Sequence, residues 1–237
     1  MQTRQDPVDW LIEDKPTLRD QTVHILREAI LTEVFAPGTK LVERSLADQT
    51  GVSRTSIREA LSQLEAEKLV TRVPGKGMHV AKLTIAEARE IYEVRAVLES
   101  AMARLFVERA TQDDLDDLIE AVKRARNSDT PDMARAHAQA LDEVFDIITR
   151  GGENSIARQM AGLLRTRVTY LRTITSKVAP ADRRQESLRR LDDIRRAFEE
   201  RDADRAESLI RAYVERSAEF AITVLGSMTA EADVEKD

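Results

Sequence analysis

The sequence predicts a mainly α-helical protein, in which an N-terminal winged helix-turn-helix domain precedes an all-α antiparallel helical bundle. The composition favours helices, because Ala, Leu, Arg and Glu are abundant and aromatic residues make up only 4% of the 237 residues. Apolar residues recur at helical spacing along most of the chain. Near the N-terminus, a Gly-containing turn separates two short helical patterns, and a predicted β-hairpin follows them.

The N-terminal end is predicted to hold an arm and one helix. Residues 1–14 are polar and include a proline, so we expect a loosely ordered, flexible arm. Thr17 and Asp20 form a capping signal, and the helix that they open should end near Phe35, because Pro37-Gly38 is a turn sequence. The apolar positions of this helix are Val23, Leu26, Ile30 and Val34.

A helix-turn-helix is predicted next. Its first helix covers about 42–49 and is interrupted by Gly51. Ser53 is a suitable N-cap for the second helix, which should run to about residue 67. A helix, a Gly-containing turn and a second helix at this spacing are typical of the motif.

Two short strands at 69–73 and 78–81 follow the helix-turn-helix and flank a turn that contains Pro, Gly and Lys. This pattern predicts a β-hairpin, the wing of a winged helix. We therefore assign 15–82 to the winged helix-turn-helix domain.

Helical patterns fill the chain after residue 82. Thr84-Ile85-Ala86-Glu87 is a capping box for a long helix that continues through Leu105. Stops at Gly151-Gly152 and Pro180 separate later helices. These later helices are expected at 111–126, 132–150, 154–176, 181–200 and 203–225. The six helices predict a bundle over 83–228, followed by a frayed acidic tail at 229–237.

The charge is unevenly distributed along the chain. The net charge of −6 looks unsuited to a nucleic-acid partner, but residues 40–82 carry eight Lys or Arg against five Asp or Glu. Phosphates respond to charge within a Debye length of ~8–10 Å, so the local balance of +3 matters more than the total.

Several classes of protein are excluded by what the sequence lacks. Zero Cys removes disulfides, thiol nucleophiles and Cys-rich metal sites, and three His are too few for a His-rich site. No apolar run approaches the ~20 residues of a membrane span and the first residues lack a signal-peptide core, so we expect a cytoplasmic protein with no membrane partner. No Gly-rich phosphate loop is recognisable, and we expect no enzymatic activity.

The segment GTKLVERSLADQTGVSRTSIREALSQLEAEKLVTRVPGKGMHVA closely resembles the DNA-binding domain of the GntR family of bacterial transcription regulators, over about 45 residues. The helical remainder is similar to the FadR-type C-terminal domain of that family, through EIYEVRAVLESAMARL, LDEVFDIITRGGENS and FEERDADRAESLIRAYV. The resemblance implies a homodimer, commonly a repressor, that binds a pseudo-palindromic double-stranded operator. It also implies that the helical domain dimerises and senses a small molecule.

The second helix of the motif carries most residues expected to contact DNA. The N-terminal turn of such a helix enters the major groove, where Arg can donate to both acceptors of guanine. Arg54 and Arg58 lie four residues apart and share a helix face. With the contacts that the resemblance adds, the predicted DNA-binding residues are Arg44, Ser53, Arg54, Thr55, Ser56, Arg58, Lys76 and Gly77. Alternatively, Arg54 and Arg58 are solvated charges paired with Glu43 or Glu59.

Many FadR-type domains hold a divalent metal with one Asp and three His, and the resemblance places these four ligand positions in this sequence. Asp142 matches the family Asp, whereas Asp146, Leu191 and Tyr213 occupy the three His positions. Zinc and similar borderline metals prefer imidazole nitrogen. We therefore expect neither the usual metal nor any other cofactor.

Asp142 and Asp146 have two interpretations. They share a helix face and, with water, could hold a hard cation such as Mg²⁺ or Ca²⁺ weakly. We favour the alternative that they meet arginines of neighbouring helices, because buried carboxylates need a partner. The candidate arginines are Arg95, Arg165, Arg167 and Arg172. His137 lies off the Asp142 face, and we expect a surface or half-buried residue there rather than a ligand.

We expect a ligand pocket that persists without a metal. Tyr213 would offer a hydroxyl and Arg95 a cation, unless Leu191 and Tyr213 are simply core residues. The effector would be an organic or acyl-type acid, or there is none. The predicted effector-binding residues are Arg95, Asp142, Asp146 and Tyr213.

Two other functions are alternatives to a transcription regulator. One is a winged-helix adaptor that binds proteins rather than DNA; its mark would be the loss of Arg54 or Arg58, and both are present. The other is an enzyme that uses Asp142 and Asp146 as an acid–base pair, although nothing nearby in the sequence supplies a substrate site.

Overall fold

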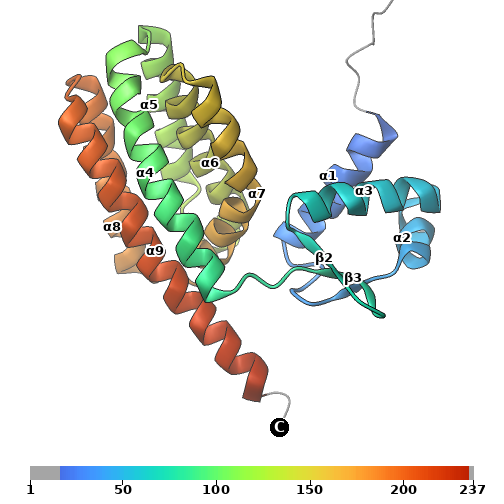
Figure 1. Ribbon diagram of the computed structural model, residues 1–237. Helices are drawn as coiled ribbons and strands as arrows, with labels where there is room; N and C mark the ends of the chain where they lie inside the picture. Colours follow the sequence, from blue (N-terminus) through green and yellow to red (C-terminus); the bar gives the residue numbers. More distant parts are fainter. Residues whose placement is uncertain (1–16, 235–237) are drawn as a thin grey trace, which may run out of the picture.

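The computed structural model describes residues 17–234, which form a small winged unit and a larger helical bundle (Figure 1). The arm predicted at 1–14 lies outside the described residues. The winged unit contains α1 (Leu18–Leu31), β1 (Lys40–Leu41), α2 (Glu43–Thr50), α3 (Arg54–Ala66), β2 (Val70–Val73) and β3 (Gly77–Val80). The bundle contains α4 (Ile85–Arg109), α5 (Gln112–Asn127), the 3-10 turn η1 (Pro131–Met133), α6 (Ala134–Gly151), α7 (Ser155–Val178), α8 (Ala181–Glu199) and α9 (Ala203–Val234). The predicted fold class is confirmed.

Helix α1 begins at the predicted capping box and ends earlier than predicted. It stops at Leu31, not near Phe35, because Glu33 adopts a left-handed φ of 62° that breaks the helix. The backbone N–H of Phe35 donates to the carbonyl oxygen of Ala29 and closes the helix end. Val34, which was expected on the buried face, is therefore exposed.

The helix-turn-helix forms at the predicted place. Gly51 ends α2 with a left-handed φ of 72°, a conformation that glycine adopts without a steric penalty. Ser53 then caps α3, and its side-chain oxygen accepts a hydrogen bond from the backbone N–H of Ser56 at 3.1 Å. One face of α3 is buried against α1, so the opposite face is left in solvent.

The wing is a three-stranded sheet with the order β1-β3-β2. Strands β2 and β3 form the predicted antiparallel hairpin, with Val73 opposite Gly77 at its closed end. Strand β1 was not predicted, because two residues are too few to show an alternating pattern. It pairs with β3 and puts Lys40 opposite His79, so Lys40 lies beside the wing.

The bundle packs around a core shared by its helices. Helix α4 packs most extensively against α9, and α6 lies against both α5 and α7 (Figure 1). The rings of Phe106 on α4 and Phe198 on α8 meet edge to face, 5.0 Å apart between centroids.

Two boundaries in the bundle differ from the prediction. The segment expected as one helix at 132–150 divides into η1 and α6. Helix α9 continues to Val234 and includes most of the segment at 229–237 that we expected to be a frayed tail. The reason is that neither Gly nor Pro follows Gly226, and Ala, Glu and Met favour continued helix.

Within residues 17–234, two ion pairs join the winged unit to the bundle. Arg135 of α6 donates to both carboxylate oxygens of Glu28 on α1, at 2.6 and 3.0 Å. Lys177 of α7 pairs with Glu33. Helix α7 also packs against α1 and lies on the side of the bundle toward the winged unit (Figure 1).

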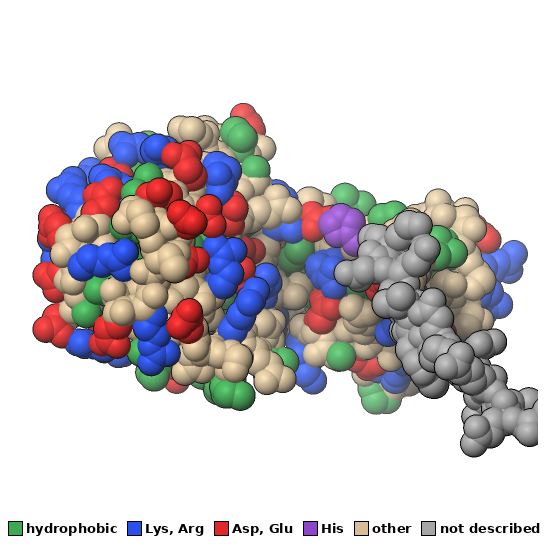
Figure 2. Space-filling model, turned by 90° about the horizontal axis from the view of Figure 1, so that it is seen from above, with side chains coloured by type: hydrophobic (Ala, Val, Ile, Leu, Met, Phe, Trp, Pro, Cys, Tyr) green, Lys and Arg blue, Asp and Glu red, His purple; other side chains and the backbone are tan. Residues whose placement is uncertain are grey.

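Positive and negative side chains are interspersed over the face of the bundle seen in Figure 2. Many charged side chains of the bundle form ion pairs, such as Arg124 with Glu143 at 2.8 Å. Among the helices that the structure describes, none combines the length and the apolar character that crossing a membrane requires.

Candidate nucleic-acid interface and ligand pockets

The exposed face of α3 presents the predicted arginine pair. Arg54 begins the helix and Arg58 follows one turn later, and both side chains are exposed. Arg58 donates two hydrogen bonds to the carboxylate of Glu43 on α2, from Nε at 3.1 Å and from Nη2 at 2.7 Å. Glu43 and Glu59 were the two carboxylates considered as partners of the arginine pair, and Arg58 is bonded to Glu43. The arginine remains 62% exposed, so the pair is accessible from solvent.

Glu43 lies among three guanidinium groups. The hydrogen bonds from Arg58 hold the pKa of the Glu43 carboxyl below its usual range, and the charges of Arg54 and Arg72 lower it further. Arg72 projects from β2 and also lies 3.8 Å from Glu65. Arg72 was not among the predicted contact residues; its only signal in the sequence is a basic residue in a predicted wing strand.

The predicted hydroxyl residues mainly serve the start of α3. The side-chain oxygens of Ser53 and Ser56 lie 2.9 Å apart, and Ser53 also holds the helix cap. Thr55 is exposed on the same turn. The first backbone N–H groups of a helix attract an anion, so this end of α3 suits a phosphate.

The wing tip carries two lysines and two glycines. The backbone N–H of Lys76 donates to Val73 at 3.0 Å and closes the turn, while the Lys76 side chain is exposed. Gly75 and Gly77 have left-handed φ values of 72° and 92°, which side-chain-bearing residues rarely adopt. The Cε atom of Lys40 lies 3.9 Å from where a Cβ at Gly77 would be, so Lys40, which was not predicted as a contact residue, adds a cation beside the wing.

Arg44, the remaining predicted contact residue, projects from α2. Its side chain is 81% exposed and its Nε lies 4.0 Å from Asp48. An exposed pair at that distance holds the arginine weakly. Arg44 is therefore free to turn toward a phosphate.

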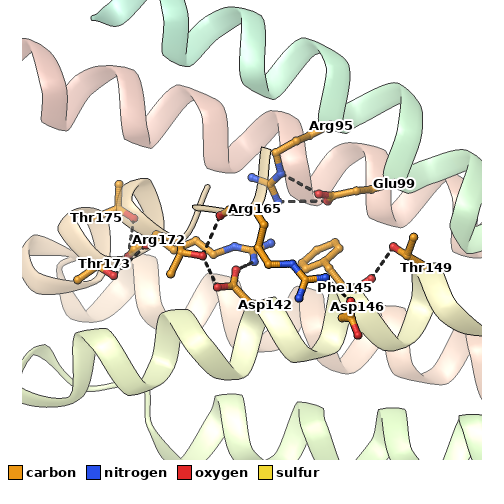
Figure 3. Close-up of polar contacts among 11 residues, drawn as sticks. Arg95, Glu99, Asp142, Phe145, Asp146, Thr149, Arg165, Arg172, Thr173 and Thr175 are labelled. Atoms are coloured by element: carbon orange, nitrogen blue, oxygen red, sulfur yellow. Dashed lines mark hydrogen bonds and ion pairs between the residues drawn. The ribbon is translucent and has the colours of Figure 1, made fainter. Parts of the chain in front are cut away.

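In the bundle, the two predicted aspartates meet arginines of α7 (Figure 3). Asp142 accepts hydrogen bonds from Arg172 and from the hydroxyl of Thr169, and Asp146 accepts one from Arg165. Arg165 and Arg172 are two of the four arginines that we considered as partners. The arginines thus supply the positive charge that these half-buried carboxylates need.

The four predicted effector residues divide between two pockets. Arg95 and Tyr213 line one pocket, whereas Asp142 and Asp146 line a second one, and Arg95 lies between the two. The guanidinium of Arg95 is buried and bonded to Glu99 at 2.8 and 3.1 Å (Figure 3), so its charge is already balanced.

The four positions that the resemblance gives to a metal do not suit one. Asp142 and Asp146 are bonded to arginines, and the buried Leu191 has no donor atom. The hydroxyl of Tyr213 lies 3.3 Å from that of Ser187. Among residues 17–234, no group of three or more His, Asp or Glu is placed to hold a metal ion.

His137 is buried, contrary to the expectation of a surface or half-buried residue. Its Nδ1 donates to the carbonyl oxygen of Ala125 at 2.8 Å, and its Nε2 lies 3.8 Å from Asp129. Burial lowers the pKa of His137 and raises that of Asp129. The signal was present in the sequence, because His137 shares a helical stripe with the buried Leu141 and Val144.

Two family models match the chain at these two units. Residues 18–80 match the family described as bacterial regulatory proteins, gntR family, and residues 90–216 match the FCD domain. The chain belongs to the GntR family. The resemblance to GntR regulators with a FadR-type C-terminal domain is therefore confirmed, and the enzyme alternative is set aside because the family consists of regulatory proteins.

Curated relatives of this GntR-family protein are also regulators. It is 44% identical over 80 residues to an uncharacterised HTH-type transcriptional regulator of Agrobacterium vitis, a match that covers 34% of this chain and 47% of the relative. It is 25% identical over 213 residues to the HTH-type transcriptional repressor RspR of Escherichia coli, a match that covers 90% and 92% of the two chains. The chain spans about half the length of the first relatives that it matches, at 47% and 55%.

Solved structures share the fold of this GntR-family protein over most of its length. A putative transcriptional regulator GntR from Rhodococcus sp. RHA1 superposes with a TM-score of 0.73 at 21% identity, over 88% of this chain and 97% of the other. The Escherichia coli protein McbR/YncC superposes with a TM-score of 0.72 at 21% identity, over 90% and 99%. At this identity the likeness shows the fold alone.

Proposed function

We propose that this GntR-family protein is a sequence-specific DNA-binding transcription regulator. One observation carries the proposal: the exposed face of α3 presents Arg54 and Arg58 one turn apart, beside the wing, on a chain that is acidic overall. The basic part of the chain, 40–82, directs phosphates to this face, and the acidic remainder discourages adhesion elsewhere.

The contacts at DNA follow from the geometry of α3 and the wing. The N-terminal turn of α3 enters the major groove, where the planar guanidinium of Arg58 donates to O6 and N7 of a guanine instead of to Glu43. Arg54 reads or holds the same groove. Lys40 and Lys76 contact phosphates from the wing. Such phosphate contacts position the protein on DNA but do not depend on the base sequence.

The protein acts as a cytoplasmic homodimer and, like its relative RspR, as a repressor. A symmetric dimer requires a pseudo-palindromic operator, with one α3 in each half-site. The winged domain, 15–82, binds the operator, and the bundle, 83–228, holds the dimer together and senses the effector.

The effector is a small organic acid bound in the bundle without a metal. Arginines line the pocket beside Tyr213, and an acid complements their charge. Helix α7 carries pocket residue Arg172 and also Lys177, which pairs with Glu33 of the winged unit, so a ligand that shifts α7 changes that contact. The effector thereby alters the placement of the two winged domains.

The DNA-binding proposal is tested by selecting duplexes from a random library with the full-length protein. A regulator enriches a pseudo-palindromic sequence, which then shifts in a mobility assay with strong salt dependence. The adaptor alternative predicts no enrichment of any sequence. Thermal shift with organic acids, with and without Zn²⁺ and EDTA, tests the effector proposal, and a large metal-dependent rise in melting temperature would contradict it.

A further inference from the structure

One pocket of the bundle contains buried polar atoms that lack hydrogen-bond partners. It lies between α4, α6, α7, α8 and α9 and has a cavity volume of about 60 Å³. A cavity of roughly 150 Å³ takes benzene, so a ligand of this pocket has only a few non-hydrogen atoms in its enclosed part. Its charged lining residues are Arg95, Arg172, Arg183, Arg184 and Asp129.

Arg172 lines this pocket as well as the neighbouring one and carries a free donor. Its side chain is only 8% exposed, and Nη1 is used by Asp142. The guanidinium stacks 4.6 Å from the ring centroid of Phe145. Nη2 is buried and has no hydrogen-bond partner among the described residues. A buried donor without an acceptor is costly, so a ligand acceptor here is favoured.

Arg183 offers two more donors. Its Nε and Nη1 are buried without hydrogen-bond partners in the described part of the chain. The carboxylate of Glu186 is 4.0 Å from Nη1, which is beyond hydrogen-bond distance. Glu186 is also bonded to Arg190 at 3.1 Å and to Arg216 at 3.0 Å, and Arg216 has a second partner in Glu219 at 2.7 Å, so two carboxylates serve three guanidiniums. Arg183 lines the pocket, so its unpaired donors are available to a ligand there.

Asp129 is an acceptor that lacks a donor. Its Oδ2 is buried and has no hydrogen-bond partner among residues 17–234. Its Oδ1 lies 3.8 Å from Nε2 of His137, whose Nδ1 is donating to Ala125. A neutral His137 therefore turns an acceptor nitrogen toward the carboxylate. Two acceptors face each other, and a donor placed beside them would satisfy Asp129.

We propose that this pocket binds a small carboxylic acid that carries a hydroxyl or an ammonium group on the adjacent carbon. Its carboxylate accepts from Arg172 and Arg183, and its donor group bonds to Asp129. A plain carboxylate satisfies only the arginines and leaves Asp129 unpaired. The inference rests on the proposed function and deepens it, because it names the chemical class of the effector.

The first test needs only the native full-length protein. Calorimetric titration compares lactate, alanine and propionate, which have the same three-carbon chain and differ at the adjacent carbon. We expect lactate or alanine to bind at least about tenfold more tightly than propionate, since a hydrogen bond to a charged group distinguishes them. The lactate and alanine arms identify whether the donor is hydroxyl or ammonium. Equal affinities for all three acids, or no binding of any at millimolar concentration, would overturn the inference.

Two variants locate the site. Asp129→Asn should reduce binding of the preferred acid to the level of propionate, whereas Arg183→Met should weaken both acids at least tenfold. Arg189→Met is the matched control, because Arg189 is an exposed arginine on the same helix. This variant should bind the acids with the affinity of the native protein. Unaltered discrimination in folded Asp129→Asn would contradict the assignment of Asp129.

Failure of this inference and failure of the proposed function give different results. The same protein preparation is tested for binding to its selected operator. Operator binding without discrimination among the acids removes only the effector class. Loss of both operator and acid binding rejects the regulator itself.

Discussion

Arg58 of α3 and Glu43 of α2 are joined by two hydrogen bonds, at 3.1 and 2.7 Å, on the surface proposed to meet DNA. The pair holds the guanidinium plane extended, and it also occupies the donors that a guanine would use. Because the pair is exposed, the contact is weak enough to be exchanged for a base. We therefore propose that Glu43 competes with DNA for Arg58.

Replacing that competitor should strengthen DNA binding. In Glu43→Gln, Arg58 loses its charged partner, and a negative charge near the phosphates disappears. We expect about threefold to tenfold tighter binding to non-specific DNA, on the order of 1 kcal/mol, in fluorescence anisotropy at low salt. Glu120→Gln, on the exposed surface of α5, is the control and should bind like the native protein. Weaker binding by Glu43→Gln would mean that Glu43 positions Arg58 rather than competing for it.

The wing lysine should contribute to affinity without reading sequence. In Lys76→Ala we expect uniformly weaker binding to operator and random duplex. We also expect the slope of log K against log salt to fall by about one for each protomer. The control is Lys123→Ala on α5, where the lysine is paired with Glu120 at 2.6 Å. A loss confined to the operator would instead assign base contact to Lys76.

The contact between the two units should be acid-sensitive. The hydrogen bonds from Arg135 hold the pKa of Glu28 below its ordinary value of 4.5. The ionised Glu28 therefore adds stability above about pH 4.5, and this contribution is lost as pH falls through the lower pKa of the folded state.

The substitution Glu28→Gln removes that contribution. At pH 7 we expect a melting temperature about 2–4 °C lower than that of the native protein, which corresponds to about 1 kcal/mol. The difference should shrink as the pH is lowered below about 4.5. A difference that is constant from pH 7 to pH 3 would show that the carboxylate charge is not responsible.

Gly151 should be intolerant of any side chain. A Cβ at this position would lie 2.6 Å from the ring of Phe106 and 3.3 Å from Cβ of Ala110. Gly151→Ala should therefore destabilise the bundle by about 1–3 kcal/mol in urea unfolding. Gly162→Ala is the matched control, because a Cβ there meets nothing within 4 Å, and we expect a gain of about 0.5–1 kcal/mol. Equal stability of the two variants would contradict the tight packing of α6 on α4.

Local signals predicted most of the fold. The capping pairs, the glycine that ends α2 and the apolar stripes act over a few residues, so the sequence reveals them directly. Strand β1 escaped prediction because it exists only through pairing with β3. The predicted stop at Gly151-Gly152 is confirmed, because Gly151 is the last residue of α6. The close packing of Gly151 against Phe106 could not be predicted, because it depends on how α6 lies on α4.

The candidate DNA interface was more predictable than the ligand pocket. Arg54 and Arg58 belong to one helix, so their spacing alone places them on one face. In the pocket, Asp129, Arg172 and Arg183 come from separate elements, and their unpaired atoms depend on which neighbours are already bonded. No local sequence pattern predicts which of these atoms remain unpaired. The arginine partners of Asp142 and Asp146 could be anticipated only as a set, because four arginines had suitable positions.

The measurement that tests the central claim most directly is the affinity of Arg58→Ala for the operator selected by the native protein. Fluorescence anisotropy at fixed salt should show a loss of about 1–3 kcal/mol, or about 5–150-fold, with relaxed preference at one base pair of each half-site. Arg189→Ala, which removes an exposed arginine of α8, should leave the affinity unchanged. Unchanged operator affinity in Arg58→Ala, with the variant folded, would contradict the account that α3 reads DNA through this residue.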